Sequence, residues 1–170
     1  MPIANIPQPA FLEIDDTLRL RRYDGSFDFA LAWYRDEELV YLVDGVRRTY
    51  DADGVRGMYG YLHRKGELYF IEAKTPEGWV PIGDVTFWQQ DMPIVIGEAD
   101  YRGHGVGKKV VRRLIDRGRE LGYDTLYIGD IYSFNTASRR CFEALGFRPY
   151  AKTELGDKYV LKLCEDKTGK

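Results

Sequence analysis

A glycine-rich turn between an apolar run and a basic amphipathic segment constrains this chain most. Residues 93–96 have the length of a short strand, and residues 106–121 repeat apolar side chains at helical spacing. Between them lies the segment 101–109, Tyr-Arg-Gly-His-Gly-Val-Gly-Lys-Lys, with three glycines at alternate positions. Glycine frees the backbone and lets a ligand approach closely. The sequence therefore predicts a strand–loop–helix unit whose loop binds a ligand.

The charge at the start of the predicted helix indicates the sign of that ligand. Lys108 and Lys109 stand there with no acidic residue nearby, although the positive end of a helix dipole favours acids. Free N–H groups and two lysines together favour an anion, most simply a phosphate, and a broken local rule often marks a functional site. On the loop alone, a glycine turn followed by a solvated basic helix face remains an alternative.

Two common phosphate-binding motifs fail on this loop. A P-loop requires glycine where Arg102 stands and serine or threonine where Lys109 stands. A dinucleotide fingerprint requires a third glycine where Lys108 stands. The pattern that remains is Arg102-x-x-Gly105-x-Gly107.

Composition excludes several classes of function. The 170 residues are 44% apolar and 31% charged, which is typical of a globular chain. The net charge of −2 argues against nucleic acid as a partner. Cys141 and Cys164 have neither a disulfide-framework nor a metal-site spacing, and no segment has the pattern of a signal peptide or a membrane span. We therefore expect a cytoplasmic protein without a metal or a membrane partner, and a homodimer is left open.

The order of expected elements indicates an α+β fold. We expect one domain over residues 1–170, with a mostly antiparallel sheet, flanking helices and one parallel βαβ unit around the glycine loop. Residues 1–16 are expected to form an extended arm and 165–170 a frayed tail. The expected strands are 17–23, 67–73, 79–87, 93–97, 125–128, 147–152 and 158–163, with Gly83 as a candidate bulge. The expected helices are 26–34, 36–45, 54–62, 106–121 and 136–145.

Two motifs in this order resemble those of one family. Arg102-x-x-Gly105-x-Gly107 looks like the Q/R-x-x-G-x-G/A signature of the GCN5-related N-acetyltransferase (GNAT) family. Asn135 and the segment 142–147, Phe-Glu-Ala-Leu-Gly-Phe, resemble the family's Asn…Tyr-Glu-x-Leu-Gly-Phe helix. The element order extends the resemblance over nearly the whole chain, and residues 32–42 resemble the branch that includes ribosomal-protein and aminoglycoside acetyltransferases. The resemblance implies transfer of an acetyl group from acetyl-coenzyme A (acetyl-CoA) to a primary amine.

The resemblance also implies which residues hold acetyl-CoA. Its pyrophosphate would lie on the backbone of the loop, and its pantetheine arm on the open edge of the preceding strand. Asn135 would cap its helix and contact the cofactor, and Phe142 would line the same site. The implied cofactor-binding residues are Val95, Ile96, Gly97, Arg102, Gly103, His104, Gly105, Val106, Gly107, Lys108, Asn135 and Phe142.

The catalytic residues are less constrained. The family commonly places a tyrosine, acting as general acid for the leaving thiolate, where this chain has Phe142. Tyr132, near the predicted site, is the substitute candidate; alternatively the thiolate leaves unassisted. Asp130 is the best candidate for the base, although it could simply form a turn after Gly129. Glu98 is second, and strand alternation could direct it into solvent.

The acceptor is predicted only as a class. Glu72, Asp84, Glu98 and Asp130 are expected to gather at one side of a cleft lined by aromatic residues. Such a cleft favours a cationic amine, either a small molecule or a peptide: a polyamine, an aminoglycoside or a protein N-terminus. Phe142 keeps open a non-catalytic acyl-CoA-binding or sensor module, and a phosphate-binding regulatory domain is a weaker alternative.

Overall fold

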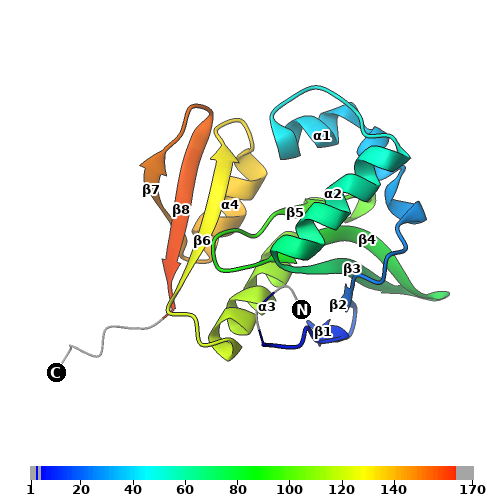
Figure 1. Cartoon of the computed structure of the whole chain (residues 1–170), viewed down its shortest axis with the longest axis horizontal. Coiled ribbons are helices and arrows are strands. Elements are labelled where there is room, and N and C mark those ends of the chain that lie inside the picture. Colours follow the sequence, from blue (N-terminus) through cyan, green and yellow to red (C-terminus); the bar gives the residue numbers. More distant parts are fainter. Residues whose placement is uncertain (1–2, 4, 164–170) are drawn as a thin grey trace.

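The computed structural model describes residues 3 and 5–163; the predicted tail at 165–170 and Cys164 lie outside this part of the chain. The strands form two sheets, of order β1–β2–β3–β4–β5 and β6–β8–β7, which Figure 1 shows as two separate walls. The strands are β1 (Phe11–Glu13), β2 (Leu18–Arg22), β3 (Glu67–Thr75), β4 (Gly78–Phe87), β5 (Ile94–Ile96), β6 (Thr125–Tyr132), β7 (Arg148–Lys152) and β8 (Gly156–Lys162). The helices are α1 (Glu37–Asp44), α2 (Ala52–Lys65), α3 (Val106–Glu120) and α4 (Thr136–Ala144), with 3₁₀ turns η1 (Asp28–Ala30), η2 (Trp33–Arg35) and η3 (Ala99–Tyr101).

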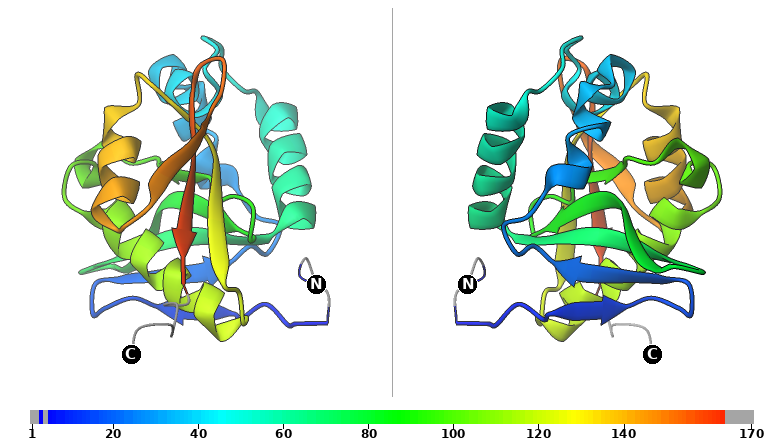
Figure 2. Two further views of the ribbon diagram at one scale, coloured as in Figure 1. Left: turned by 90° about the vertical axis from the view of Figure 1, so that its left-hand side faces the viewer. Right: turned by 90° about the vertical axis from the view of Figure 1, so that its right-hand side faces the viewer.

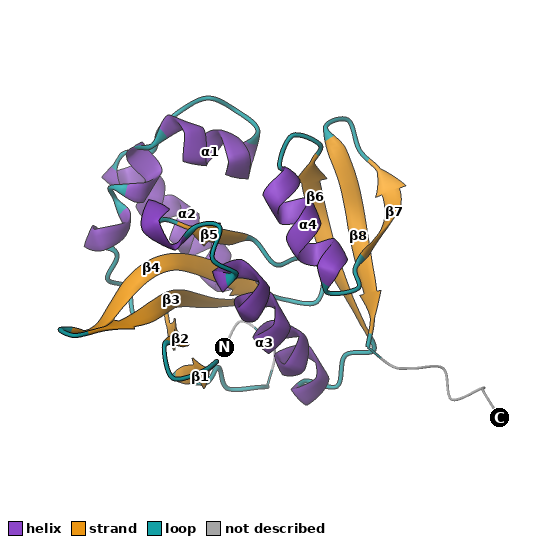
Figure 3. Ribbon diagram, turned by 180° about the vertical axis from the view of Figure 1, so that it is seen from behind, coloured by secondary structure: helices purple, strands orange, loops and turns teal. Residues whose placement is uncertain are grey.

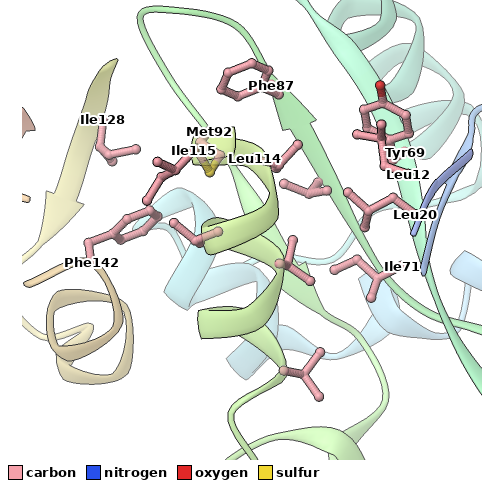
Figure 4. Packing of buried hydrophobic residues seen from close by; sticks show 14 of the residues in the cluster. Leu12, Leu20, Tyr69, Ile71, Phe87, Met92, Leu114, Ile115, Ile128 and Phe142 are labelled. Carbon is pink, nitrogen blue, oxygen red and sulfur yellow. The ribbon is translucent and has the colours of Figure 1, made fainter. Parts of the chain in front are cut away.

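The larger sheet is covered by helices on both faces, as Figures 2 and 3 show for α2 and α3. Alternation along β3 explains this, because neighbouring side chains of a strand point to opposite faces. Leu68 and Phe70 pack in the cluster with α1 and α2, whereas Tyr69 and Ile71 pack in the cluster with α3. Figure 4 shows the second cluster, which extends from the β2 side chains to Phe142 on α4. One continuous core therefore joins the two walls.

Three expectations differ from the structure. Part of the predicted arm pairs antiparallel with β2 as the strand β1. The helix expected over 26–34 consists of the turns η1 and η2, whose residues Ala30, Trp33 and Tyr34 are buried in the cluster with α1 and α2. The bulge expected at Gly83 lies at Ile82 instead. Ile71 is opposite Gly83 and the next residue, Glu72, is opposite Pro81, so Ile82 has no partner on β3.

The strands on either side of α3 also pair differently from the expectation. β5 pairs with β4 and β6 pairs with β8, and all strand pairs within residues 5–163 are antiparallel. The βαβ crossover is present in chain order, but its two strands lie in different sheets. The β4–β5 connection joins them at one end, where the Tyr127 N–H donates to Gln89 O at 2.9 Å. The strand edges that face each other beyond this joint define the space for a site.

A buried carboxylate fixes the helical layer to the sheet. Asp84 on β4 is 2% exposed and accepts hydrogen bonds from the hydroxyls of Tyr34, in η2, at 2.6 Å and Tyr59, in α2, at 2.7 Å. Burial raises the pKa of Asp84 to about 6, against the lowering effect of the two hydroxyls. The side chain predicted for the cleft is therefore a structural group in the core.

The raised pKa makes stability depend on pH with a defined sign. The pKa of Asp84 is about 6 in the folded chain and near 3.8 in the unfolded chain, so folding favours the protonated form. The free energy of unfolding of the wild type, relative to that of Asp84→Asn, should therefore fall by roughly 3 kcal/mol as pH rises through both values. Urea titrations of both proteins at a series of pH values measure this difference. Parallel curves would show that Asp84 has a normal pKa.

Candidate functional site

A cavity of about 280 Å³ lies between the two sheets. β6, α4, the C-terminal end of α1 and the start of β5 contribute its walls. Four residues predicted for the site, Asp130, Tyr132, Asn135 and Phe142, line it together. The other lining residues are Leu42, Val43, Asp91, Met92, Pro93, Ile94, Ile128, Ile131 and Ser138. The open edges of β5 and β6 thus enclose the space in which the sequence analysis placed the reaction.

The glycine loop lies between η3 and α3, after the strand β5 whose first residue, Ile94, lines this cavity. Gly103 and Gly105 have φ of +75° and +79°, and a Cβ built on either would meet no atom within 4 Å. The first helical hydrogen bond runs from Lys109 N to Gly105 O at 3.1 Å. The N–H groups of Val106, Gly107 and Lys108 precede it in the first turn and point out of the helix end. No side chain caps α3, so the loop offers open space and backbone donors to an anion.

The two lysines in this turn have different surroundings. The Lys109 ammonium binds Asp15 Oδ2 at 2.8 Å, and this contact with Lys109 lowers the pKa of Asp15. Lys108 forms no ion pair with any residue among 5–163. His104 is exposed in the loop. One of the two unexpected charges therefore anchors the N-terminal part of the chain, and the other is available to an anion.

Arg102 connects the loop to the end of β5. Its guanidinium donates from Nε to Ile96 O at 2.8 Å and from Nη2 to Gly97 O at 3.0 Å. Its own backbone N–H donates to Ala99 O at 3.1 Å within η3. Val95 and Ile96 pair with β4 on one side only. Arg102 thus fixes the loop against the C-terminal end of β5, whose first residue, Ile94, lines the cavity.

The two predicted carboxylates are in different places. Asp130 is exposed at the cavity and accepts a hydrogen bond from Thr153 Oγ1 at 2.6 Å. Glu98 does not line the cavity; its Oε1 accepts from Trp33 Nε1 at 2.8 Å. The structure therefore brings Asp130, but not Glu98, to the site.

Tyr132 and Asn135 hold the end of α1 over the cavity. The Tyr132 hydroxyl donates to Asp44 O at 3.0 Å, and burial raises its pKa, with a smaller effect of Asp130. Asn135 caps α4 by accepting from Ser138 N at 3.2 Å, while its Nδ2 donates to Leu42 O at 3.3 Å. The Phe134 ring stacks against Tyr132, with 5.3 Å between ring centroids. The cap predicted at Asn135 is therefore present, and the Tyr132 hydroxyl donates to a main-chain carbonyl.

Phe142 forms an apolar wall of the cavity. It is 2% exposed and meets Phe147 edge-on, with 5.3 Å between ring centroids. Cys141, beside it on α4, faces Gly107: its Sγ lies 3.8 Å from the position of a Cβ at that glycine. Burial raises the pKa of the Cys141 thiol to about 11, so this thiol is protonated at neutral pH.

Asp91 is the cavity residue that the sequence analysis missed. It precedes β5, and its Oδ1 accepts from Met92 N at 2.8 Å and from Gly129 N at 2.9 Å. Burial raises its pKa, opposed by these two hydrogen bonds. The sequence does contain one signal for Asp91, because this residue stands just before the strand that leads into the glycine loop. Asp91 places a carboxylate with a raised pKa in the cavity wall.

The predicted cluster of acids at the cleft is only partly formed. Glu72 is 5% exposed and lies between Arg19 and Arg21 on β2, with Nε–O distances of 2.8 and 2.9 Å. The register of β2 and β3 places these arginines beside it, so Glu72 is a neutralised sheet residue. Within the described chain, the carboxylates that line the cavity are Asp91 and Asp130.

Comparison with known proteins identifies the same family that the glycine loop and the Asn135 motif resemble. The sequence profile of the acetyltransferase (GNAT) domain matches residues 17–148 of the chain. The chain belongs to the GNAT acetyltransferase family. A search of curated protein sequences gives no match.

Solved GNAT structures share the fold. YncA, a putative acetyltransferase from Salmonella typhimurium solved with acetyl-CoA, is 20% identical with a TM-score of 0.62, covering 89% of this chain and 96% of its own. An acetyltransferase from the same organism that modifies the N-terminal serine of ribosomal protein L7/L12 is 16% identical, with a TM-score of 0.67 and coverage of 89% and 98%. The aminoglycoside acetyltransferase AAC(6')-Ib in complex with coenzyme A is 19% identical, with a TM-score of 0.65 and coverage of 85% and 94%.

As a GNAT protein, the chain is an acetyl-CoA-dependent N-acetyltransferase. Of the alternatives in the sequence analysis, family membership favours the enzyme over the non-catalytic acyl-CoA-binding module. The site fits this donor, because the loop leaves open space at Gly103 and Gly105 and the cavity lies beside the free edge of β5. The structure contains no helix able to cross a membrane within the residues it describes. Over the same residues, no three His, Cys, Asp or Glu side chains are grouped to bind a metal.

Proposed function

We propose that this GNAT protein, a single cytoplasmic domain, acetylates a primary amine that binds in the cavity as an ammonium, with Asp91 as the base. The observation that carries this proposal is the pair of carboxylates, Asp91 and Asp130, in a cavity that is also lined by Ile94 at the start of β5. The acceptor nitrogen attacks the thioester carbonyl directly, forming the C–N bond while the C–S bond breaks.

Asp91 suits the role of base better than Asp130. A base that accepts a proton from an ammonium works best when its own pKa is raised toward the working pH. Burial raises the pKa of Asp91, whereas Asp130 is exposed and shares its Oδ1 with Thr153. We assign the proton to Asp91 and the electrostatic attraction of the ammonium to Asp130; Glu98, bonded to Trp33, supports the end of β5.

The leaving thiolate has no tyrosine at the usual position. Phe142 supplies an apolar wall, and Tyr132 would have to give up its bond to Asp44 O to donate a proton. Because a thiol with a pKa near that of cysteine is a competent leaving group, we propose that the thiolate leaves without a protein acid in the first step.

For the donor, we propose binding along the residues predicted by resemblance. The pyrophosphate would lie on the N–H groups of Gly103 to Lys108, beside the Lys108 ammonium. The pantetheine arm would lie along the edge of Val95, Ile96 and Gly97, which Arg102 holds in place. Asn135 and Phe142 would border its thioester end.

Thiol release on a panel of amines tests the proposed function. Acetyl-CoA is incubated with the protein and with a polyamine, an aminoglycoside or a peptide with a free N-terminus, and free thiol is titrated over time. We expect release that requires both an amine and the protein. Tight binding of acetyl-CoA without thiol release on any amine would contradict the proposal.

A further inference from the structure

The charges at the rim of the cavity are already compensated by the chain itself. Glu38 and Asp44 on α1 pair with Arg47 and Arg48 of the following loop, the second pair at 2.9 Å. Asp36, at the start of α1, accepts from Glu38 N and Leu39 N as the helix cap. A second ammonium of a polyamine or an aminoglycoside would therefore meet carboxylates that arginines already neutralise. The charge pattern favours an acceptor with one ammonium, at the end that enters the cavity.

Apolar side chains occupy the same rim. Leu42 on α1, Val46 in the α1–α2 loop and Leu155 in the β7–β8 turn are 43%, 55% and 49% exposed. They are three of the six exposed large hydrophobic residues of the described chain. Figure 2 shows the α1–α2 loop and the β7–β8 turn at the same end of the molecule.

Leu42 and Leu155 are both bonded through their carbonyl oxygens to the loop between β6 and α4. Leu155 O accepts from Ser133 N at 2.9 Å, and Leu42 O accepts from Asn135 Nδ2 at 3.3 Å. The loop between β6 and α4 thus has one apolar residue on each side of it. Of the three exposed apolar residues Leu42, Val46 and Leu155, here called the apolar surface, Leu42 also lines the cavity.

The cavity side of β6 adds a feature that suits a polypeptide. β6 pairs with β8 on one edge and with no other strand of residues 5–163. The β4–β5 connection covers its other edge only as far as Tyr127 and Gly129. A free strand edge can pair with an extended peptide through main-chain hydrogen bonds. A small amine would leave these groups unused.

We propose that the acceptor is the α-amino group of a polypeptide whose first side chains are apolar. This inference rests on the proposed function and narrows its acceptor. The ammonium lies between Asp91 and Asp130, the first residues extend along β6 beyond Gly129, and their side chains contact the apolar surface. Because Glu38 and Asp44 are already paired with Arg47 and Arg48, neither carboxylate is free for the second ammonium of a polyamine or an aminoglycoside.

Acceptor competition with matched variants tests this inference. Thiol release is measured with a hexapeptide beginning Met-Leu, with the same peptide blocked at its N-terminus and carrying one lysine, with spermidine, and with kanamycin. We expect kcat/KM for the free N-terminus to exceed the other values at least tenfold. Leu155→Ser and Val46→Ser should each raise KM for the peptide about tenfold, with kcat kept. Tyr61→Ser, which removes a 52% exposed side chain outside the cavity, should change neither constant.

Three results would overturn the inference in different ways. Spermidine or kanamycin turned over as well as the free peptide would refute the peptide assignment but leave amine acetylation intact. Equal effects of Leu155→Ser and Tyr61→Ser would refute the role of the apolar surface. Acetyl-CoA binding without thiol release on any acceptor would refute the proposed function and the peptide assignment together.

Discussion

Asp91→Asn is expected to lower kcat by about 10²- to 10⁴-fold, the typical contribution of general acid–base catalysis. The Kd for acetyl-CoA should stay within about twofold, because asparagine retains an oxygen that accepts from Met92 N and Gly129 N. Stopped-time assays give kcat, and calorimetric titration gives Kd. A loss of acetyl-CoA affinity equal to the loss of rate would instead assign Asp91 to the architecture of the cavity.

Asp130→Asn is the matched control for this prediction. It removes the other cavity carboxylate but leaves the raised-pKa group in place, so its main effect should be a higher KM for the amine. The pH profile distinguishes the two roles further. The wild-type kcat rises as Asp91 loses its proton, above the usual range of an aspartate because burial raises its pKa. This limb should vanish in Asp91→Asn and persist in Asp130→Asn.

Gly105→Val is expected to weaken acetyl-CoA binding by at least about 100-fold, equivalent to ~2.8 kcal/mol. Gly105 has a φ of +79°, which costs a residue with a Cβ roughly 1–2 kcal/mol. The new side chain would also fill the open space beside the first turn of α3, where the anion is proposed to lie. Calorimetric titration with acetyl-CoA, together with thermal unfolding of the free protein, measures both effects.

Gly122→Val separates these two effects. Gly122 follows α3 and has the same φ of +79°, and a Cβ added to it would likewise meet no atom within 4 Å. The backbone strain should therefore be similar, while the proposed anion site at the other end of the helix is untouched. Equal losses of acetyl-CoA affinity in the two variants would show that the loop acts only through stability.

Much of the fold was readable because its strongest elements carry local signals. α3 has a single apolar stripe, and the β3–β4 hairpin has turn residues at its tip. The 3₁₀ turns η1 and η2 were missed because their apolar spacing mimics a helix, while the burial of Trp33 and Tyr34 against the sheet is a tertiary effect. The separation of β5 from β6 depends on contacts of the β4–β5 connection with β6, which spacing along the chain does not encode.

The candidate site was predictable where its residues act through local backbone geometry, and not where they depend on tertiary contacts. The glycine loop and Asn135 act through backbone geometry, which glycine and cap residues indicate locally. Carboxylates are harder, because an acid on a strand is neutralised, buried or exposed according to its neighbours across the sheet. Glu72 meets two arginines, Asp84 meets two tyrosines, and Asp91 reaches the cavity through a contact with Gly129. None of these pairings follows from spacing in the sequence.

The contacts that hold the rim have a consequence for how this enzyme can acquire new substrates. The end of α1 and the β7–β8 turn are held through the carbonyl oxygens of Leu42, Asp44 and Leu155. Main-chain acceptors stay in place whatever side chain a residue carries. Mutation can therefore alter the chemistry of the rim without loosening it, whereas replacing Asp91 by a residue without an acceptor oxygen would remove the bond to Gly129 on β6 as well as the base. The architecture separates a constrained reaction centre from an acceptor preference that is free to diverge.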